Sequence, residues 1–310
     1  MRKKIVIAVD QSLHSKQAME YAVKIAEVVK EVDFTLLHIQ PMISQYLTEE
    51  AIRHPKARAE LEKVYEKNKK ASHQLLEDCK AHMAHKGIDV NCIEIKTQAR
   101  SHSVAGDILK MAEALPYDAI IVGRRGITGL HELFVGSVTS NLLAGSRVIP
   151  IWVVDGRIQS NKILIAVDYS SQSLRTVDHL AYIFSENREV QLQFLNIELQ
   201  LEDICEIDTE AAQTAELEKV ILNSNEKCVS DFSAKAIDIL KKAGFTEDQA
   251  SFVSAKNQFL TGKAILEAVK KGEFGTVVIG KTGTHTSRNM GRVANYIIQK
   301  MSDGVVWLVP

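Results

Sequence analysis

The sequence has few cysteines, and none of them lies in a paired spacing. Its four cysteines are Cys79, Cys92, Cys205 and Cys228. A disulfide framework needs an even set of cysteines in a compact arrangement, which this pattern does not offer. The sparse cysteines therefore favour a reducing compartment, and we expect the protein to be cytoplasmic.

Long hydrophobic runs and an excess of one charge are also missing. The longest apolar runs, such as 148–154, are far shorter than the ~20 residues of a membrane-spanning helix. The run behind the basic start ends at Asp10, too soon for a signal peptide. The 38 Lys and Arg against 39 Asp and Glu give a formal net charge of −1. We therefore expect neither nucleic acid nor a membrane as a partner.

Two segments match the letters of known nucleotide-binding motifs but lack the structural context that those motifs require. The string from Gly275 to Thr282 matches the Walker pattern Gly-x4-Gly-Lys-Thr, but its four variable residues are β-branched and predict a strand. A Walker loop instead needs amides that wrap around phosphates. Lys300-Met301-Ser302 resembles part of a synthetase signature, but its partner, a His-Ile-Gly-His-like turn, is absent, as is the Ser-Gly-Gly loop of ATP pyrophosphatases. These absences argue against AMP-forming chemistry.

What the sequence does contain is a duplication. Segment 4–10 (KIVIAVD) returns as 162–168 (KILIAVD), segment 36–39 as 194–197, and Trp152 as Trp307. The nearly constant offset predicts two domains of ordinary size, residues 1–155 and 160–310. The linker between them is short and polar, so we expect the domains to lie side by side.

Each half alternates strands and helices. Near-continuous apolar strands separated by helices predict an α/β fold, in which a doubly wound parallel sheet is covered on both faces. Helical periodicity appears at about Glu49–His85 and Ser103–Leu115. The predicted strands of the first half are about Lys4–Val9, Phe34–His38, Val90–Lys96, Ala119–Val122 and Ile149–Val154.

A spaced glycine pattern starts where the strand 118–122 ends. It reads Gly123-x2-Gly126-x9-Gly136-Ser137. A glycine at a strand end lets the backbone approach a ligand closely, because it has no Cβ. A Gly-Ser pair that opens a helix presents free N–H groups to an anion. The pattern therefore predicts a phosphate site built without a Walker loop.

This glycine pattern, the Asp that ends the first strand and the five strands per unit resemble the universal stress protein family in its tandem form. The resemblance covers the whole chain. It implies two flavodoxin-like, Rossmann-like five-stranded domains with strand order 3-2-1-4-5. It also implies that ATP or AMP binds between the first and fourth strands, with magnesium as one candidate companion of the nucleotide.

The resemblance also implies which residues would form the site. By position, Asp10 and Ile39 would contact adenine or ribose. Arg124 and its neighbour Arg125 would either pair with the β- or γ-phosphate or form an exposed loop tip. The residues that would line the phosphates and ribose are Gly123, Gly126, Gly136, Ser137, Val138 and, beside the phosphates, Thr139.

The second copy departs from this pattern. It reads Gly280-x2-Gly283-x7-Gly291-Arg292, two residues shorter and with Arg in place of Ser. Either this copy has lost nucleotide binding, or Lys281 and Arg292 form an altered anion site. Asp168 persists beside the altered loop, which indicates that an Asp here also caps a turn. The last strands, 149–154 and 305–309, are candidates to pair the halves into a pseudo-dimer, and a homodimer stays open.

Three functions remain open from the sequence. We expect an adenine-nucleotide-binding protein with a sensor or regulatory role in stress, because no general base is identifiable beside the glycine loop. His14 and His38 lie near the first cleft and are interpreted as structural histidines. The first alternative is slow ATP hydrolysis or self-phosphorylation near Ser137 or Thr139. The second is a nucleotide-free interaction scaffold.

Two further clusters are interpreted as structural. Cys79, His82 and His85 are spaced i, i+3, i+6, so they cannot share a narrow helix face, and no metal site is expected. The stretch 53–70 carries seven Lys or Arg against three Glu. It predicts a solvated, ion-paired helix, because a nucleic-acid surface would interleave more aromatic residues.

Overall fold

The computed structural model describes residues 2–125, 135–198, 215–256, 260–283 and 290–310. The chain divides into two compact units: residues 1–27 with 31–156, and residues 28–30 with 157–310. The main boundary lies in the short polar linker. Each unit holds five strands and its own helices, so each is described by itself.

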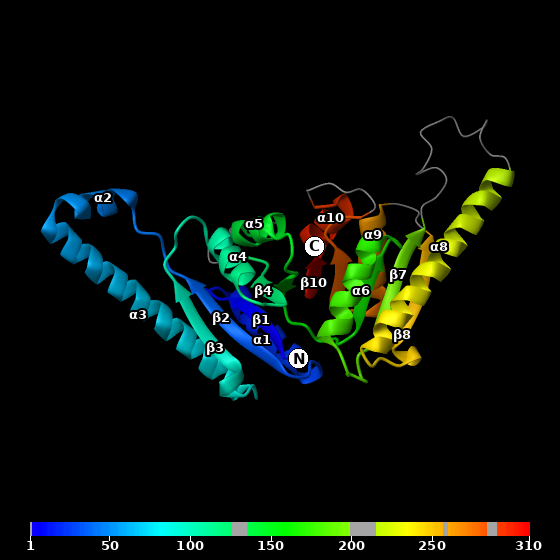
Figure 1. Cartoon of the computed structure of the whole chain (residues 1–310), viewed down its shortest axis with the longest axis horizontal. Coiled ribbons are helices and arrows are strands. Elements are labelled where there is room, and N and C mark those ends of the chain that lie inside the picture. Colours follow the sequence, from blue (N-terminus) through cyan, green and yellow to red (C-terminus); the bar gives the residue numbers. More distant parts are fainter. Residues whose placement is uncertain (1, 126–134, 199–214, 257–259, 284–289) are drawn as a thin grey trace. The chain divides into compact units, whose positions relative to one another are not determined.

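The first unit is built on a five-stranded parallel sheet (Figure 1). Its strands lie in the spatial order β3-β2-β1-β4-β5, which confirms the predicted order 3-2-1-4-5. The direction of the chain across the sheet reverses between β1 and β4, whose carboxyl ends therefore form the switch point where such sheets bind ligands. The strands are β1 (Lys3–Ala8), β2 (Val32–Ile39), β3 (Ile93–Gln98), β4 (Ala119–Gly123) and β5 (Ile151–Asp155).

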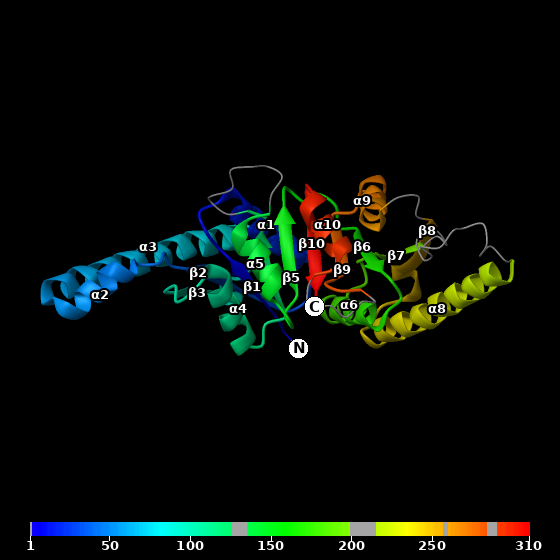
Figure 2. The ribbon, with the colours of Figure 1, turned by 90° about the horizontal axis from the view of Figure 1, so that it is seen from above.

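Helices cover both faces of this sheet. They are α1 (Leu13–Val28), α2 (Gln45–Arg53), α3 (Pro55–His85), α4 (Val104–Ala114) and α5 (Ser137–Gly145), with a short 3-10 turn η1 (Val90–Cys92) before β3. Right-handed crossovers place α1 and α3 on one face and α4 and α5 on the other. Consistent with this, α4 and α5 pack against each other (Figure 2).

Two sequence predictions for this unit were wrong in detail. The single helix expected at Glu49–His85 is two helices, broken at His54, which is extended at φ −124° and ψ 118°. Pro55 causes the break, because a proline disfavours the helical conformation of the residue before it. The strand expected at Val90–Lys96 begins only at Ile93, because Asp89 accepts a hydrogen bond from the Asn91 N–H (2.9 Å) and starts the turn η1.

The second unit repeats the architecture. Its sheet is parallel, in the order β8-β7-β6-β9-β10. Strand β9 covers the variable residues of the Walker-like string, which confirms that this string is not a phosphate loop. The elements are β6 (Ile163–Val167), α6 (Ser171–Ile183), β7 (Leu192–Glu198), α8 (Ala215–Lys242), η2 (Glu247–Gln249), β8 (Ala250–Lys256), α9 (Thr261–Gly272), β9 (Thr276–Gly280), α10 (Arg292–Lys300) and β10 (Gly304–Val309).

The cores of the two units are built around the duplicated tryptophans. Trp152 and Trp307 are both fully buried. Tyr21 packs edge-on against Trp152 with ring centroids 6.4 Å apart, whereas Phe184 stacks on Trp307 at 5.6 Å. None of the helices in the described ranges combines the length and the apolar character needed to cross a bilayer.

One core contact makes the second unit sensitive to acid. The ring of His179 packs edge-on against Trp307 (5.7 Å), and burial lowers the pKa of His179 to about 3. The unfolded chain takes up this proton near pH 6.5, so the free energy of unfolding falls as pH drops from about 6.5 towards 3. Because the His179 side chain keeps some exposed surface, we expect at most about 2 kcal/mol of loss between pH 7 and 5. Urea denaturation at both pH values should show a smaller loss in His179→Phe, and an equal loss would contradict this assignment.

Candidate functional site

At the carboxyl end of β1, Asp10 closes the turn that starts α1. Its carboxylate accepts a hydrogen bond from the Ser12 N–H at 2.9 Å. The Asp10 N–H in turn donates to the Ser15 hydroxyl at 3.1 Å, and the Ser12 hydroxyl accepts from the Ser15 N–H at 3.1 Å. Asp10 is half-buried, and its position at the switch point is fixed by these short local bonds.

The second unit builds the same turn. The Asp168 carboxylate accepts from the Ser170 N–H at 3.1 Å, and the Asp168 N–H donates to the Ser173 hydroxyl at 3.2 Å. The Ser173 N–H donates to the Ser170 hydroxyl at 3.2 Å, as Ser15 does to Ser12 in the first unit. The Asp therefore has a structural role in both copies, as the sequence indicated. A role for Asp10 towards a ligand stays a prediction.

Gly123, the last residue of β4, packs tightly against the start of α1. A Cβ on Gly123 would lie 2.6 Å from the backbone carbon and oxygen of His14 and 2.7 Å from the His14 Cβ. Contacts this short cannot be relieved by a side-chain rotation, because two of the three atoms belong to the backbone. The glycine is thus required by the protein's own packing, and it brings His14 to the edge of the glycine loop.

The glycine loop closes onto the start of α5. The Gly136 N–H donates to the Arg124 carbonyl at 2.8 Å, and the Arg124 N–H donates to the Val154 carbonyl at 2.8 Å. The buried Thr139 hydroxyl donates to the Gly123 carbonyl, also at 2.8 Å. Gly136 is the N-cap of α5 and supplies no side chain to satisfy the first N–H groups of that helix. Ser137, directly after it, is exposed.

Arg124 does not form an exposed loop tip. Its side chain is only 5% exposed and donates from Nη1 to the Asp155 carboxylate at 2.7 Å. The other oxygen of Asp155 lies 3.6 Å from Nδ1 of His14. The same Nδ1 lies 3.0 Å from the Gln17 amide oxygen. Arg124, Asp155, His14 and Gln17 therefore form a polar cluster at the end of β4, in which Arg124 is buried and the other three are half-buried.

The shortened loop of the second unit keeps the same backbone closure. The Gly291 N–H donates to the Lys281 carbonyl at 2.8 Å, and the Lys281 N–H donates to the Val309 carbonyl at 2.6 Å. A Cβ on Gly283 would lie 2.9 Å from the Asp168 carboxylate, so the turn after the first strand and the glycine loop meet at this edge. What differs between the two units is the set of side chains at the helix start.

The structure brings most of the predicted site residues to one edge of the first sheet. Gly123, Arg124, Gly136 and Thr139 are joined by the hydrogen bonds above. Ser137 and Val138 form the first turn of α5, and Ile39 is the buried last residue of β2. Gly126 lies outside the described residues. None of these positions tests ligand contact, which stays a prediction for all of them.

The sequence analysis missed three members of the cluster. Gln17 and Asp155 were not considered, and His14 was set aside as structural. Asp155 is far from the other two in sequence, and only the β4–β5 pairing brings it close to α1. One signal was available: His14, Gln17 and Asp155 are all replaced at the equivalent positions of the second copy, by Gln172, Arg175 and Pro310.

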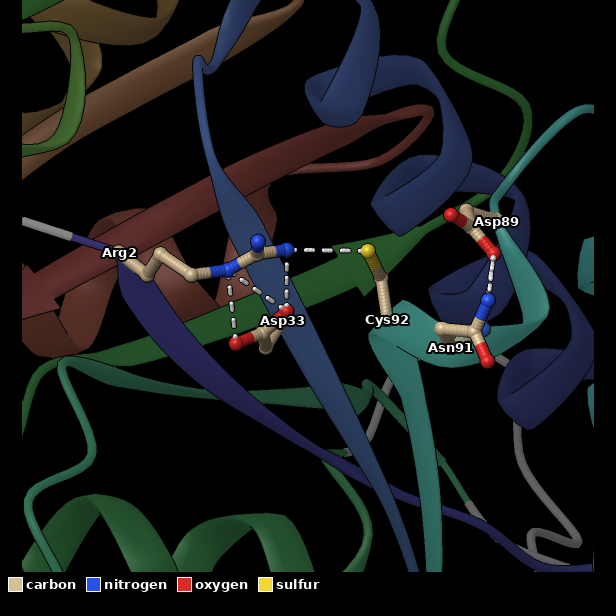
Figure 3. Close-up of polar contacts among 5 residues, drawn as sticks. All are labelled: Arg2, Asp33, Asp89, Asn91 and Cys92. Carbon is tan, nitrogen blue, oxygen red and sulfur yellow. Dashed lines mark hydrogen bonds and ion pairs between the residues drawn. The ribbon is translucent and has the colours of Figure 1, made fainter.

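Two other clusters are structural. At the opposite edge of the sheet, Arg2 donates to both oxygens of Asp33 and, at 3.0 Å, to Cys92 Sγ (Figure 3). These bonds join the starts of β1, β2 and β3. On α3, burial raises the pKa of the Cys79 thiol to about 11, whereas His82 and His85 are exposed. Within the described residues, no group of three or more His, Cys, Asp or Glu side chains is placed to hold a metal ion.

Comparison with known proteins identifies the family. The sequence profile of the universal stress protein family matches residues 1–155. Universal stress protein YxiE of Bacillus subtilis (strain 168) is 26% identical over 156 residues, which is 50% of this chain and 99% of YxiE.

Two solved structures share the fold over nearly the whole chain. A universal stress protein from Archaeoglobus fulgidus DSM 4304 matches 99% of this chain and 97% of its own, with a TM-score of 0.65 and 15% identity. The protein PA1789 of Pseudomonas aeruginosa PAO1, described as functionally unknown, matches 99% and 92% with a TM-score of 0.62 and 15% identity. These two likenesses support the fold, and the profile match supplies the family. The chain belongs to the universal stress protein family.

Proposed function

We propose that this universal stress protein binds one adenine nucleotide, ATP or AMP, in its first unit and acts as a sensor or regulator rather than as a metabolic enzyme. The observation that carries the proposal is the start of α5. Gly136 caps this helix without a side chain, is tied to the end of β4 through Arg124, and is followed by the exposed Ser137. This arrangement stands beside the β1–β4 switch point.

The described residues suit a phosphate in this place. The first N–H groups of an α-helix have no partner within the helix, and the helix dipole adds positive potential there. The Ser137 hydroxyl would add a further donor at the same point. Any magnesium would be held mainly through the phosphates, since the described residues supply no cluster of metal ligands.

The second unit supports the prediction of one nucleotide per chain. Its helix α10 starts with the same backbone closure, but Arg292 stands where Ser137 stands in the first unit, and Ala294 stands in place of Thr139. Alanine has no hydroxyl, so the second unit cannot form the hydrogen bond that Thr139 donates to the Gly123 carbonyl in the first unit. We infer that adenine nucleotide binds to the first unit alone, and that the halves form an intrachain pseudo-dimer.

Titration calorimetry tests this function. Wild type should bind ATP or AMP with a stoichiometry of one per chain, and Ser137→Asp should weaken the dissociation constant by at least tenfold. The substitution places a negative charge beside the phosphates, yet an acidic residue in the first turn favours the helix itself. Loss of folding is therefore not the expected cause of weaker binding.

The matched control is Arg292→Asp, the same change at the equivalent position of the second unit. It should leave both the dissociation constant and the stoichiometry unchanged. Saturating nucleotide should also raise the melting temperature, because a ligand at 100 times its Kd stabilises the native state by about 2.7 kcal/mol. No heat of binding and no thermal shift with wild type would contradict the proposal and favour a nucleotide-free scaffold.

A further inference from the structure

The polar cluster at the end of β4 contains a half-buried histidine whose Nδ1 is held by hydrogen bonding. We propose that Nε2 of His14 accepts a proton from the water that attacks the terminal phosphate of ATP, so that the first unit hydrolyses its nucleotide slowly. This inference rests on the proposed nucleotide binding. It assigns a general base to a site in which the sequence alone revealed none.

Hydrogen bonds to Gln17 fix the tautomer of His14. The Gly156 N–H, which can only donate, lies 3.3 Å from one terminal atom of the Gln17 amide, so that atom is the oxygen. The same oxygen lies 3.0 Å from Nδ1 of His14. An amide oxygen can only accept, so Nδ1 carries the proton of the neutral ring. Nε2 is then left with a free lone pair, as a general base requires.

Asp155 strengthens this orientation. Its carboxylate lies 3.6 Å from Nδ1 and faces the N–H that this nitrogen carries in the neutral ring. Arg124, at 2.7 Å, holds the same carboxylate in place from the other side. The His14 side chain is 19% exposed, so the ring is held by the protein but not sealed from water.

His14 also contacts the strand end that leads into the predicted phosphate site. His14 touches Gly123 through its backbone and Cβ, and Gly123 is followed by Arg124, whose carbonyl binds the Gly136 N–H. His14 and the start of α5 therefore contact two consecutive residues, Gly123 and Arg124, at the end of β4. General base catalysis requires the attacking water to lie between the imidazole and a phosphate held at α5, and this is the position that we infer for it.

The duplicated unit provides an internal comparison. Gln172, Arg175 and Pro310 stand where the first unit has His14, Gln17 and Asp155. The second unit therefore lacks the base, the residue that orients it and the carboxylate, and it is also the unit without the Gly-Ser pair. The cluster and the intact glycine motif occur together in one copy and are lost together in the other. A purely structural cluster would have no reason to follow the phosphate motif.

The proposed step is balanced without any other reactant. The water oxygen forms a bond to the γ-phosphorus while its proton passes to Nε2 of His14. The bond between the γ-phosphorus and the β–γ bridging oxygen breaks, and its electron pair stays with ADP. The imidazolium then returns its proton to solvent. Helix α5 and the Ser137 hydroxyl would hold the phosphates during this step.

Single-turnover release of inorganic phosphate tests the role of His14. Compared with wild type, His14→Gln should release phosphate at least about 100-fold more slowly, which is the lower range for loss of a general base. The dissociation constant for a non-hydrolysable ATP analogue should change less than threefold. His73→Gln, which alters an exposed histidine on α3, is the control and should behave as wild type. Gln17→Met should lower the rate of phosphate release without weakening the binding of the ATP analogue. The substitution removes the amide oxygen that selects the tautomer protonated at Nδ1.

The tautomer of His14 provides a second readout, which a merely structural role would not require. Nitrogen NMR should show His14 protonated at Nδ1. Absence of analogue binding to wild type would overturn the proposed function itself. Bound nucleotide without phosphate release, equal rates in His14→Gln, the opposite tautomer, or an acid-labile phosphate on His14 would overturn the role of His14 alone.

Discussion

Replacing Gly123 with alanine should destabilise the first unit by at least about 3 kcal/mol and abolish nucleotide binding. The new Cβ would lie 2.6 Å from two backbone atoms of His14. Neither β4 nor the start of α1 can move alone, because β4 pairs with both β1 and β5. Overpacking a tight core contact costs typically 1–3 kcal/mol, and more where backbone meets backbone. The displaced segments carry Arg124, after β4, and His14, at the start of α1.

Gly280→Ala is the matched control at the equivalent position of the second unit. There the nearest atom to a new Cβ is the Thr282 carbonyl oxygen at 3.2 Å, so the cost should be roughly 1 kcal/mol. Each unit contains one tryptophan, so urea denaturation in a Trp307→Phe background reports on the first unit and in a Trp152→Phe background on the second. Equal losses for Gly123→Ala and Gly280→Ala would show that the close approach to His14 has no energetic consequence.

The fold could be predicted because the signals for it are local and repeated. The apolar strands, the helical periods and the duplicated segments all lie within short windows, and the family resemblance supplied the strand order. The predicted element boundaries were wrong at two places where a single residue determined the local backbone conformation. Pro55 broke a helix whose period continues past it, and Asp89 delayed β3 by starting a turn.

The candidate site could be predicted only in part. The glycine spacing is visible in the sequence, but the reason for Gly123 is not. The sequence suggested that its missing Cβ makes room for a ligand, whereas the structure shows that it makes room for His14. The contact of Asp155 with Arg124 depends on the pairing of β4 with β5, and no local pattern reports it.

Comparison of the two units distinguishes the features that the backbone forms in both from those that depend on side chains present in one. Both close the glycine loop with the same two backbone hydrogen bonds, although one loop is two residues shorter. Both also keep the Asp that caps the first turn. This backbone arrangement therefore exists twice. The side chains of Ser137, Thr139, His14 and Asp155 are present once, so they distinguish the first unit from the second.

Breaking the buried ion pair should be the second large effect. Arg124→Met removes the cation that pairs with the Asp155 carboxylate, which is 13% exposed, and Asp155→Leu removes the carboxylate that the Arg124 guanidinium, 5% exposed, binds at 2.7 Å. Removal of one partner of a buried pair typically costs 3–5 kcal/mol, because the remaining charge stays desolvated. We expect about that loss for each single substitution in urea denaturation of the Trp307→Phe background. Single losses below about 1 kcal/mol would instead place the pair among exposed ones.

The double variant Arg124→Met with Asp155→Leu distinguishes a purely structural role of Arg124 from a direct contact with a phosphate. Apolar replacement of both partners should recover most of the stability, because no charge is left buried. If Arg124 serves only to hold Asp155 and the loop, ATP and AMP affinities should recover together with stability. If it also pairs with a β- or γ-phosphate, the double variant should be stable, bind AMP normally and bind ATP at least tenfold more weakly. The buried bond to Asp155 favours the first outcome, because forming a phosphate contact would require Arg124 to leave an ion pair already made at 2.7 Å.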